Sequence, residues 1–231
     1  QCTQMAHEGR PVETNIAPIG DYPAELYEDD KPQDECGVFG IWAPGEQVCE
    51  ITFRALKALQ HRGQSSAGIG YYDAGGVHGI DGSGRMSYSK GHGLVGEALT
   101  EFIAPGGKSH YGLDALTQSH VAIGHTRYST AESDNIEYAH PFLPGHTGVV
   151  YVHNGHVQSG SAESDSAWLA NLVDEAAAKR DGSIMQALRK DLAPVEGAYN
   201  LVVANKDALY AARDPWGFHP LVLGRLATGT V

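Results

Sequence analysis

Apolar residues along the chain recur with two different periods, and each period predicts a kind of element. Short apolar runs bounded by Gly, Pro or Asn have the length and alternation of strands. From residue 48 to residue 59 the apolar positions recur at helical spacing and form one stripe. Together the patterns predict strands at 36–42, 67–72, 121–125, 148–152, 199–204, 208–212 and 220–223, and helices at 48–59, 165–176 and 183–192.

The order of these elements indicates the fold class. Strands come in clusters, separated by helices, whereas a parallel βαβ fold would alternate strand and helix throughout. The pattern therefore predicts an α+β fold in which two antiparallel sheets are covered by helices.

Residues 1–35 differ in composition from the rest of the chain. They are rich in Glu, Asp, Pro and Gln and show no sustained period, which is typical of an extended or loosely ordered segment. The composition changes at Cys36, and no linker-like stretch divides the chain after that point. We therefore expect a leader at 1–35 and one domain at 36–231.

Charge and cysteine content narrow the function classes. The chain of 231 residues has 16 Lys and Arg against 28 Asp and Glu, a net charge of −12, which argues against a nucleic-acid or anionic-membrane surface. The three cysteines lack the paired spacing of a zinc site or a disulfide framework. We therefore expect the protein to reside in a reducing compartment. No apolar signal region or membrane-span run occurs, so we expect a cytoplasmic protein without metal or cofactor in this chain.

Cys36 opens the first predicted strand and could serve either packing or chemistry. The other motifs in the sequence favour a chemical role for Cys36, because polar residues follow at the ends of later predicted strands and at the start of a predicted helix. In chain order the motifs are CGVFGI, LQHRGQSSAGI, GHTRYST, AHPF, HNG, SDS, GAYNLVV and RDPWGFHPL. This series resembles the glutaminase domain of the glutamine phosphoribosylpyrophosphate amidotransferases, which are class II glutamine amidotransferases.

The resemblance implies a fold and a reaction. The fold would be the four-layer αββα sandwich of the N-terminal nucleophile hydrolases. The reaction would be hydrolysis of the side-chain amide of L-glutamine through a thioester on Cys36, with the free α-amino group of that cysteine as base. Such an amine exists only after the bond between Glu35 and Cys36 is cut, so the leader would be a propeptide removed autocatalytically.

The resemblance also assigns substrate contacts. Arg127 would grip the α-carboxylate of glutamine, since its planar fork suits bidentate binding, although a structural ion pair is the alternative. Asp165 would bind the α-ammonium group, and it could also serve as a helix cap. Thr130 and His140 complete the substrate-binding set, and His140 stands where the family usually has Gln.

Asn154 and Gly155 have two interpretations. In the family they would form the oxyanion hole, Asn154 through its side-chain amide and Gly155 through its backbone N–H. Asn-Gly between apolar runs is also the commonest hairpin turn signal. The preceding His153 and the other motifs favour the oxyanion role.

Departures from the family pattern at Ser65, His140, Ala167 and His219 indicate a divergent paralogue. The acidic phosphoribosylpyrophosphate-binding loop does not occur in these residues, so ammonia would pass to a phosphoribosyltransferase domain or partner subunit. We also expect a homo-oligomer. Two alternatives remain open: a repurposed N-terminal nucleophile amidohydrolase that acts on another amide, and a catalytically silent interaction domain.

Overall fold

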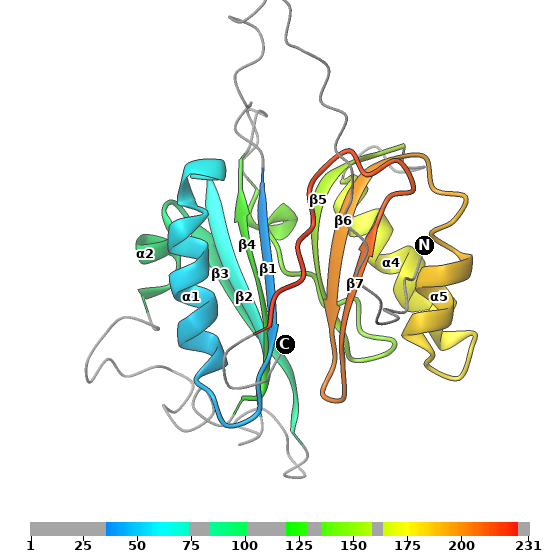
Figure 1. The fold of residues 1–231 in the computed structure, drawn as a ribbon, viewed down its shortest axis with the longest axis horizontal. Helices are drawn as coiled ribbons and strands as arrows, with labels where there is room; N and C mark the ends of the chain where they lie inside the picture. Colours follow the sequence, from blue (N-terminus) through cyan, green and yellow to red (C-terminus); the bar gives the residue numbers. More distant parts are fainter. Residues whose placement is uncertain (1–35, 74–83, 101–118, 129–134, 159–163, 226–231) are drawn as a thin grey trace, which may run out of the picture. The chain divides into compact units, whose positions relative to one another are not determined.

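The computed structural model describes residues 36–73, 84–100, 119–128, 135–158 and 164–225 (Figure 1). The chain divides into two units at residues 33 and 34, and all described residues belong to the second unit. The predicted leader therefore lies outside the described residues.

Four antiparallel strands form the first sheet, in the order β1-β4-β2-β3. In β1, Gly37 lies opposite Thr126 of β4, and on the other side of β4 Ser66 of β2 lies opposite Arg127. The strands are β1 (Gly37–Trp42), β2 (Ser66–Asp73), β3 (Arg85–His92) and β4 (Val121–Arg127).

Three antiparallel strands form the second sheet, in the order β5-β6-β7, so β5 lies at a sheet edge. Asn154 of β5 lies opposite Asn200 of β6, and Gly155 lies opposite Tyr199. The strands are β5 (Val150–Val157), β6 (Gly197–Ala204) and β7 (Leu209–Arg213).

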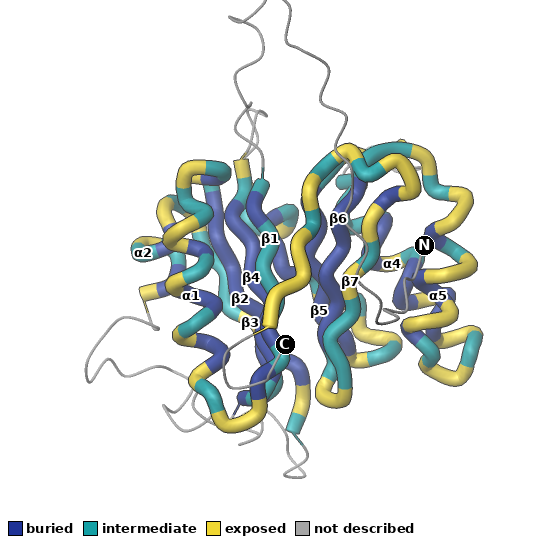
Figure 2. Tube along the Cα trace, in the orientation of Figure 1, coloured by how far each residue is buried: buried dark blue, intermediate teal, exposed yellow. Residues whose placement is uncertain are grey.

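Helices cover the outer face of each sheet, which gives four layers (Figure 1). The helices α1 (Val48–Ala58) and α2 (Val95–Ala98) pack on the first sheet, and α4 (Asp165–Ala178) and α5 (Ile184–Lys190) pack on the second. Strands β2, β4, β5 and β6 are largely buried, whereas β3, β7 and the outer helix faces contain exposed residues (Figure 2). This arrangement confirms the predicted αββα sandwich.

A core between the two sheets joins their inner faces. Val121 and Ile123 from β4 meet Val150 and Val152 from β5 and Val202 from β6. The alternate residues of the same strands pack outward, as Ala122 does in the core under α1 and Tyr151 in the core under α4. Side chains alternate between the two faces of a strand. Residues of β4 and β5 that lie an even number of positions after these core residues therefore also face the space between the sheets.

Two sequence predictions of strands differ from the structure. Residues 220–223 are not a strand, and Val222 and Leu223 are 88% and 83% exposed. Pro220 has no N–H to donate to a ladder, and none of the described strands pairs with this segment. Conversely, Arg85–His92 is a strand that pattern reading missed, because its polar residues lie at a sheet edge and it is held by pairing with β2.

Among the described residues, no helix is long and apolar enough to cross a membrane.

The carboxylate of Asp174 holds α4 to the loop before β5. Asp174 is fully buried, and it accepts hydrogen bonds from the backbone N–H groups of His146 (2.8 Å) and Thr147 (3.1 Å). It also accepts from the hydroxyl groups of Thr147 and Tyr151. A buried charge is tolerated when donors surround it in this way, so Asp174 fixes the entry of the chain into β5.

We predict that Asp174→Ala lowers the free energy of unfolding by about 3 kcal/mol or more, because it leaves several buried donors without an acceptor. Urea unfolding followed by circular dichroism measures the change. The neighbouring Glu175→Ala is the control, since its pair with Lys179 is exposed and contributes less than about 1 kcal/mol. Equal stability of the two variants would contradict the role given to Asp174.

Candidate active site

Cys36 lies directly before β1, beside the end of β4. Because Gly37 is paired with Thr126, Cys36 comes next to Arg127 and Tyr128 across the two strands. The Sγ atom lies 3.9 Å from the carbonyl oxygen of Tyr128, and the Cys36 carbonyl accepts a hydrogen bond from Nε of Arg62 (3.4 Å). The site therefore contains one thiol with two cationic side chains nearby.

Burial raises the pKa of the Cys36 thiol, and the hydrogen bond to Tyr128 and the charges of Arg127 and Arg62 offset only part of this effect. The thiol is therefore protonated at neutral pH. A nucleophilic role for Cys36 requires a base that removes this proton during the reaction.

Arg127 is the last residue of β4 and is brought to the inner face of its sheet. Val121 and Ile123 of the same strand lie in the core between the sheets, so the two-residue period puts His125 and Arg127 on that face. Its carbonyl accepts from the backbone N–H of Ser65 (2.9 Å), which fixes the end of the strand.

Asn154 and Gly155 lie within β5 and not in a turn. The strand continues to Val157, five residues beyond the predicted end at 152, so the hairpin interpretation is wrong. Val150 and Val152 face the first sheet, so the buried Asn154 side chain faces it too. The second sheet thus presents an amide group toward the sheet that carries Arg127.

The backbone groups of alternate β5 residues point to the free edge of that sheet. Tyr151 exchanges two hydrogen bonds with Phe142 at this edge, each 2.9 Å long. On the other side, Tyr199 opposite Gly155 bonds to Asp214 and not to β5. The N–H of Gly155 therefore points to the free edge, like the groups of Tyr151.

The residues of β5 whose backbone groups point to this edge are Tyr151, His153, Gly155 and Val157. In the described structure, backbone groups of three of them have partners. Phe142 binds Tyr151, His125 Nε2 lies 3.0 Å from the carbonyl oxygen of His153, and Asp165 accepts from the N–H of Val157 (3.1 Å). The N–H of Gly155 lies between the last two contacts and is left available. An available N–H beside an inward-facing amide is the donor pair that an oxyanion hole requires.

Position 155 accepts only glycine. Its φ is +144°, and a Cβ atom there would collide with the carbonyl oxygen of Ala198 on β6. Close packing of β5 against β6 therefore explains the glycine at this position.

Asp165 is the first residue of α4, and the N-cap is Ser164, whose hydroxyl accepts from the N–H of Ala167 (3.2 Å). The carboxylate of Asp165 accepts from Val157, as described above, and lies 3.3 Å from Nδ1 of the exposed His156. Asp165 therefore ties the start of α4 to the end of β5. It lies near a helix N-terminus, as predicted, but it is not the capping residue.

Three buried histidines lie between the proposed catalytic groups. The rings of His125 and His140 are stacked with centroids 3.9 Å apart, and the ring of His153 lies 6.5 Å from that of His140. Burial lowers the pKa of His125 to about 3 and that of His153 to about 4, and it lowers the pKa of His140 well below its usual value. All three rings are therefore neutral near pH 7.

The segment that carries His140 is held by Lys90 of β3. Nζ of Lys90 donates to the carbonyl oxygen of Ala139 (2.7 Å) and lies 5.4 Å from the centroid of the Phe142 ring. Burial lowers the pKa of Lys90, and the charge of Glu137 opposes this effect. His140 is thereby kept in the interior, stacked on His125 and away from solvent.

The structure thus brings together several predicted site residues. Cys36 and Arg127 lie side by side across β1 and β4, Asn154 faces them from β5, and Gly155 and Asp165 are neighbours along the free edge of β5. Glu35 and Thr130 lie outside the described residues. Sequence reasoning missed His125, for which the available signal was a polar residue at a buried strand position. It also missed Ser166 of α4, whose hydroxyl lies 2.8 Å from Nδ1 of His153.

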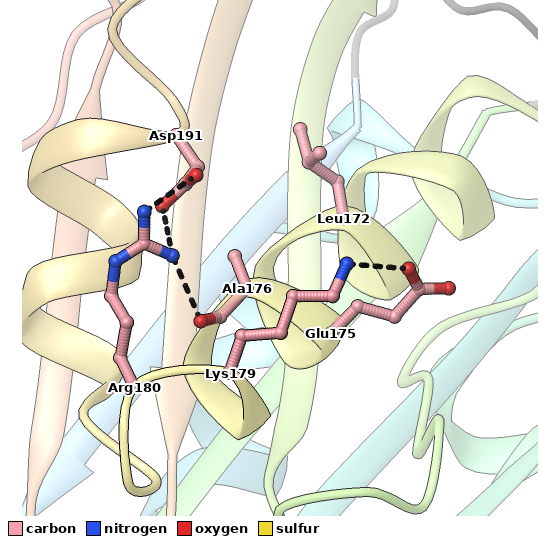
Figure 3. A pocket seen from close by; sticks show the side chains of 6 residues that line it. All are labelled: Leu172, Glu175, Ala176, Lys179, Arg180 and Asp191. Atoms are coloured by element: carbon pink, nitrogen blue, oxygen red, sulfur yellow. Dashed lines mark hydrogen bonds and ion pairs between the residues drawn. The ribbon is translucent and has the colours of Figure 1, made fainter.

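Two hollows lie elsewhere. One, of about 420 Å³, lies on the helical layer, where Arg180 joins α4 to α5 by donating to the Ala176 carbonyl oxygen (2.9 Å) and to Asp191 (3.1 Å) (Figure 3). The other, of about 770 Å³, is a largely apolar groove along β1 and β7 that residues 221–225 also line. Within the described ranges no three His, Cys, Asp or Glu side chains gather as a metal site would require.

Comparison with known proteins gives independent evidence on the family. No protein-family model matches the chain. Similar curated proteins include the amidophosphoribosyltransferases of Mycobacterium tuberculosis (39% identical over 220 residues) and Synechococcus elongatus (35% over 220 residues). Each match covers 87% of this chain, whereas the chain spans only 38% and 40% of those relatives.

Two solved structures are also similar. The glutamine phosphoribosylpyrophosphate amidotransferase from B. subtilis complexed with ADP and GMP has a TM-score of 0.60 and 27% identity, over 82% of this chain and 40% of that one. The structure of the allosteric regulatory enzyme of purine biosynthesis has a TM-score of 0.59 and 26% identity, over 79% of this chain and 38% of that one.

The four layers and these matches define the fold of an N-terminal nucleophile hydrolase, as found in class II glutamine amidotransferases. The chain belongs to the amidophosphoribosyltransferase family, as a homologue of about two fifths of the length of its curated relatives.

We predict that stability falls as the pH is lowered from about 6.5 toward 4. The folded-state pKa values of His125, His140 and His153 lie below the unfolded value, so the unfolded chain binds more protons in this window. Each histidine contributes up to about 2 kcal/mol of loss between pH 7 and pH 5. Urea unfolding at both pH values measures it, with the exposed His61→Gln as control; equal stability at pH 7 and pH 5 would contradict the prediction.

Proposed function

We propose that residues 36–231 form a glutaminase domain that hydrolyses the side-chain amide of L-glutamine. The observation that carries the proposal is the placement of Cys36 beside Arg127 at the adjacent ends of β1 and β4, opposite an inward-facing Asn154 and a Gly155 N–H for which the described residues provide no partner. The family relationship supports it, because the relatives are named amidophosphoribosyltransferases.

In the proposed reaction, the thiol of Cys36 loses its proton to the base, and sulfur attacks the side-chain carbonyl carbon of glutamine. The oxyanion that forms accepts hydrogen bonds from the Asn154 amide and the Gly155 N–H. Ammonia leaves with the proton held by the base, and water then cleaves the thioester to release glutamate and regenerate the thiol.

The base in this proposal is the α-amino group of Cys36. An amide nitrogen is not basic, so the amine is available only when the bond between Glu35 and Cys36 has been cut. We accordingly propose that residues 1–35 are a propeptide removed autocatalytically. The α-amino group released at Cys36 would then remove the proton from the thiol of the same residue, whose pKa is raised.

Substrate binding would use the two charges at the ends of the site. Arg127 would bind the α-carboxylate and Asp165 the α-ammonium group, with Thr130 as a further contact. The sequence also assigned His140 to substrate binding, but its side chain is buried. Because the structure buries His140 in a stack with His125, we propose that it supports the site from behind.

Ammonia would pass to a phosphoribosyltransferase site outside this chain, in a further domain or partner subunit. The names of the relatives support this acceptor. A cytoplasmic location and a homo-oligomer remain predictions from the sequence.

We predict that Cys36→Ala abolishes glutamate release from glutamine, whereas Cys49→Ala retains it. Cys49 is the matched control because it is a buried core residue of α1, with a pKa raised to about 12 by burial. The assay measures glutamate and ammonia, and mass spectrometry establishes whether the parent chain begins at Cys36. Undiminished turnover by Cys36→Ala would end the proposal.

We predict that Arg127→Lys and Asp165→Asn each raise KM for glutamine by about 30-fold or more, with a smaller effect on kcat. A lost contact to a charged substrate group costs about 2 kcal/mol or more, and neither group reacts. The exposed Arg54→Lys is the control. If glutamine without its α-carboxylate is as good a substrate as glutamine, a repurposed amidohydrolase becomes the better interpretation.

A further inference from the structure

His125 makes an unusual connection between the two sheets. It belongs to β4 of the first sheet, and its Nε2 lies 3.0 Å from the carbonyl oxygen of His153 on β5 of the second sheet. Both residues are buried, with 0% and 2% exposure. The bond therefore joins the strand that ends at Arg127 to the residue that directly precedes Asn154.

The carbonyl of His153 is a sheet-edge acceptor that β6 does not use. It points to the free edge of β5, in line with the carbonyl of Tyr151, which Phe142 binds. The pairing between Phe142 and Tyr151 is an isolated bridge and does not extend toward His153. His125 takes the place of a further strand residue and satisfies this buried acceptor.

The acceptor determines the form of the imidazole. A carbonyl oxygen only accepts, so Nε2 of His125 carries the hydrogen, and the neutral ring has its lone pair on Nδ1. His140 stacks on this ring. The ring is thus held by one directed bond and one close, tilted ring contact.

This bond restrains the backbone that carries the proposed oxyanion hole. The carbonyl of His153 and the N–H of Asn154 belong to one planar peptide group. Fixing that plane from the first sheet limits the direction of the Asn154 side chain and of the following Gly155 N–H. We propose that His125 is a positioning residue that holds the oxyanion hole at a set distance from Arg127, two residues further along its own strand.

A packing role alone does not account for a histidine here. The inner-face neighbours on the same strand are Val121 and Ile123, and burying an imidazole in such surroundings is unfavourable unless it is hydrogen-bonded. An apolar side chain of similar volume would pack without this penalty. The hydrogen bond to the His153 carbonyl oxygen is therefore what a histidine at position 125 adds over an apolar residue.

The proposal rests on the proposed glutaminase activity and is tested with three variants of the full, processed chain. His125→Phe removes the N–H donor, and His125→Gln restores an amide N–H at a similar reach. His120→Phe is the matched control, since its Nε2 also contacts a carbonyl oxygen, that of Lys206 (2.6 Å), outside the site. Thermal unfolding checks that each variant is folded.

We expect His125→Phe to lower kcat for glutamine hydrolysis at least 10-fold while KM changes less than 3-fold. His125→Gln should recover most of kcat, and His120→Phe should match the parent. The rate of Cys36 alkylation by iodoacetamide, read by peptide mass spectrometry, should be unchanged in all three. A rise in KM with kcat unchanged, or equal losses in the Phe and Gln variants, would overturn the proposal.

Nuclear magnetic resonance separates this inference from the glutaminase proposal. If the parent does not hydrolyse glutamine, the proposed function fails, and the position of His125 is judged from spectra of ¹⁵N-labelled protein. An Nε2-protonated ring in the parent, with Asn154 and Gly155 amide signals that shift in His125→Phe, supports the restraint. An Nδ1-protonated ring, or unshifted signals, overturns it. If His125→Phe does not fold, the tautomer of His125 in the parent tests the proposal alone: a ring protonated on Nε2 supports it, and a ring protonated on Nδ1 overturns it.

Discussion

The contact between the inner faces of the two sheets determines where every proposed catalytic group lies. Valine and isoleucine side chains from β4, β5 and β6 fill this layer and are removed from water. The thiol and the guanidinium group come from the first sheet, and the amide donors come from the second. Their relative placement therefore depends on how closely the apolar faces pack, and not on any loop.

Near one end of β4 this layer contains the buried side chain of His125, which has a directed partner in the carbonyl oxygen of His153. Asp174 shows the same rule in the outer core, since its buried carboxylate is surrounded by donors. The buried histidines differ from Asp174, because their rings are neutral and no charge has to be compensated. The interior thus tolerates polar side chains where they restrain the backbone, as at the entry of β5 and beside Asn154.

Much of the fold could be predicted from apolar spacing alone. The helix at 48–59 was found because it buries a regular apolar stripe, and the strand at 199–204 because it is a short, continuously buried run. The strand at 85–92 was missed because its polar residues lie at a sheet edge, where backbone pairing replaces apolar burial. Residues 220–223 were wrongly assigned, since an apolar run forms a strand only where a neighbour supplies a ladder.

The candidate site was predictable to a different degree. Cys36, Arg127 and Asp165 could be assigned through motifs, whereas the role of His125 depends on a contact across 28 positions of sequence. The direction of the Gly155 N–H likewise follows from strand pairing, which only the structure supplies. Local patterns therefore suggest the proposed reacting groups, and tertiary packing determines what surrounds them.

The partly buried environment of Cys36 has a consequence for the chemical durability of the protein. Peroxides and other cellular oxidants attack the thiolate and hardly the thiol. Because burial raises the pKa of Cys36, the resting thiol is largely in the unreactive form. In the proposed reaction, where Cys36 is deprotonated only when its base and substrate are in place, the thiol would thereby be protected from irreversible oxidation between turnovers.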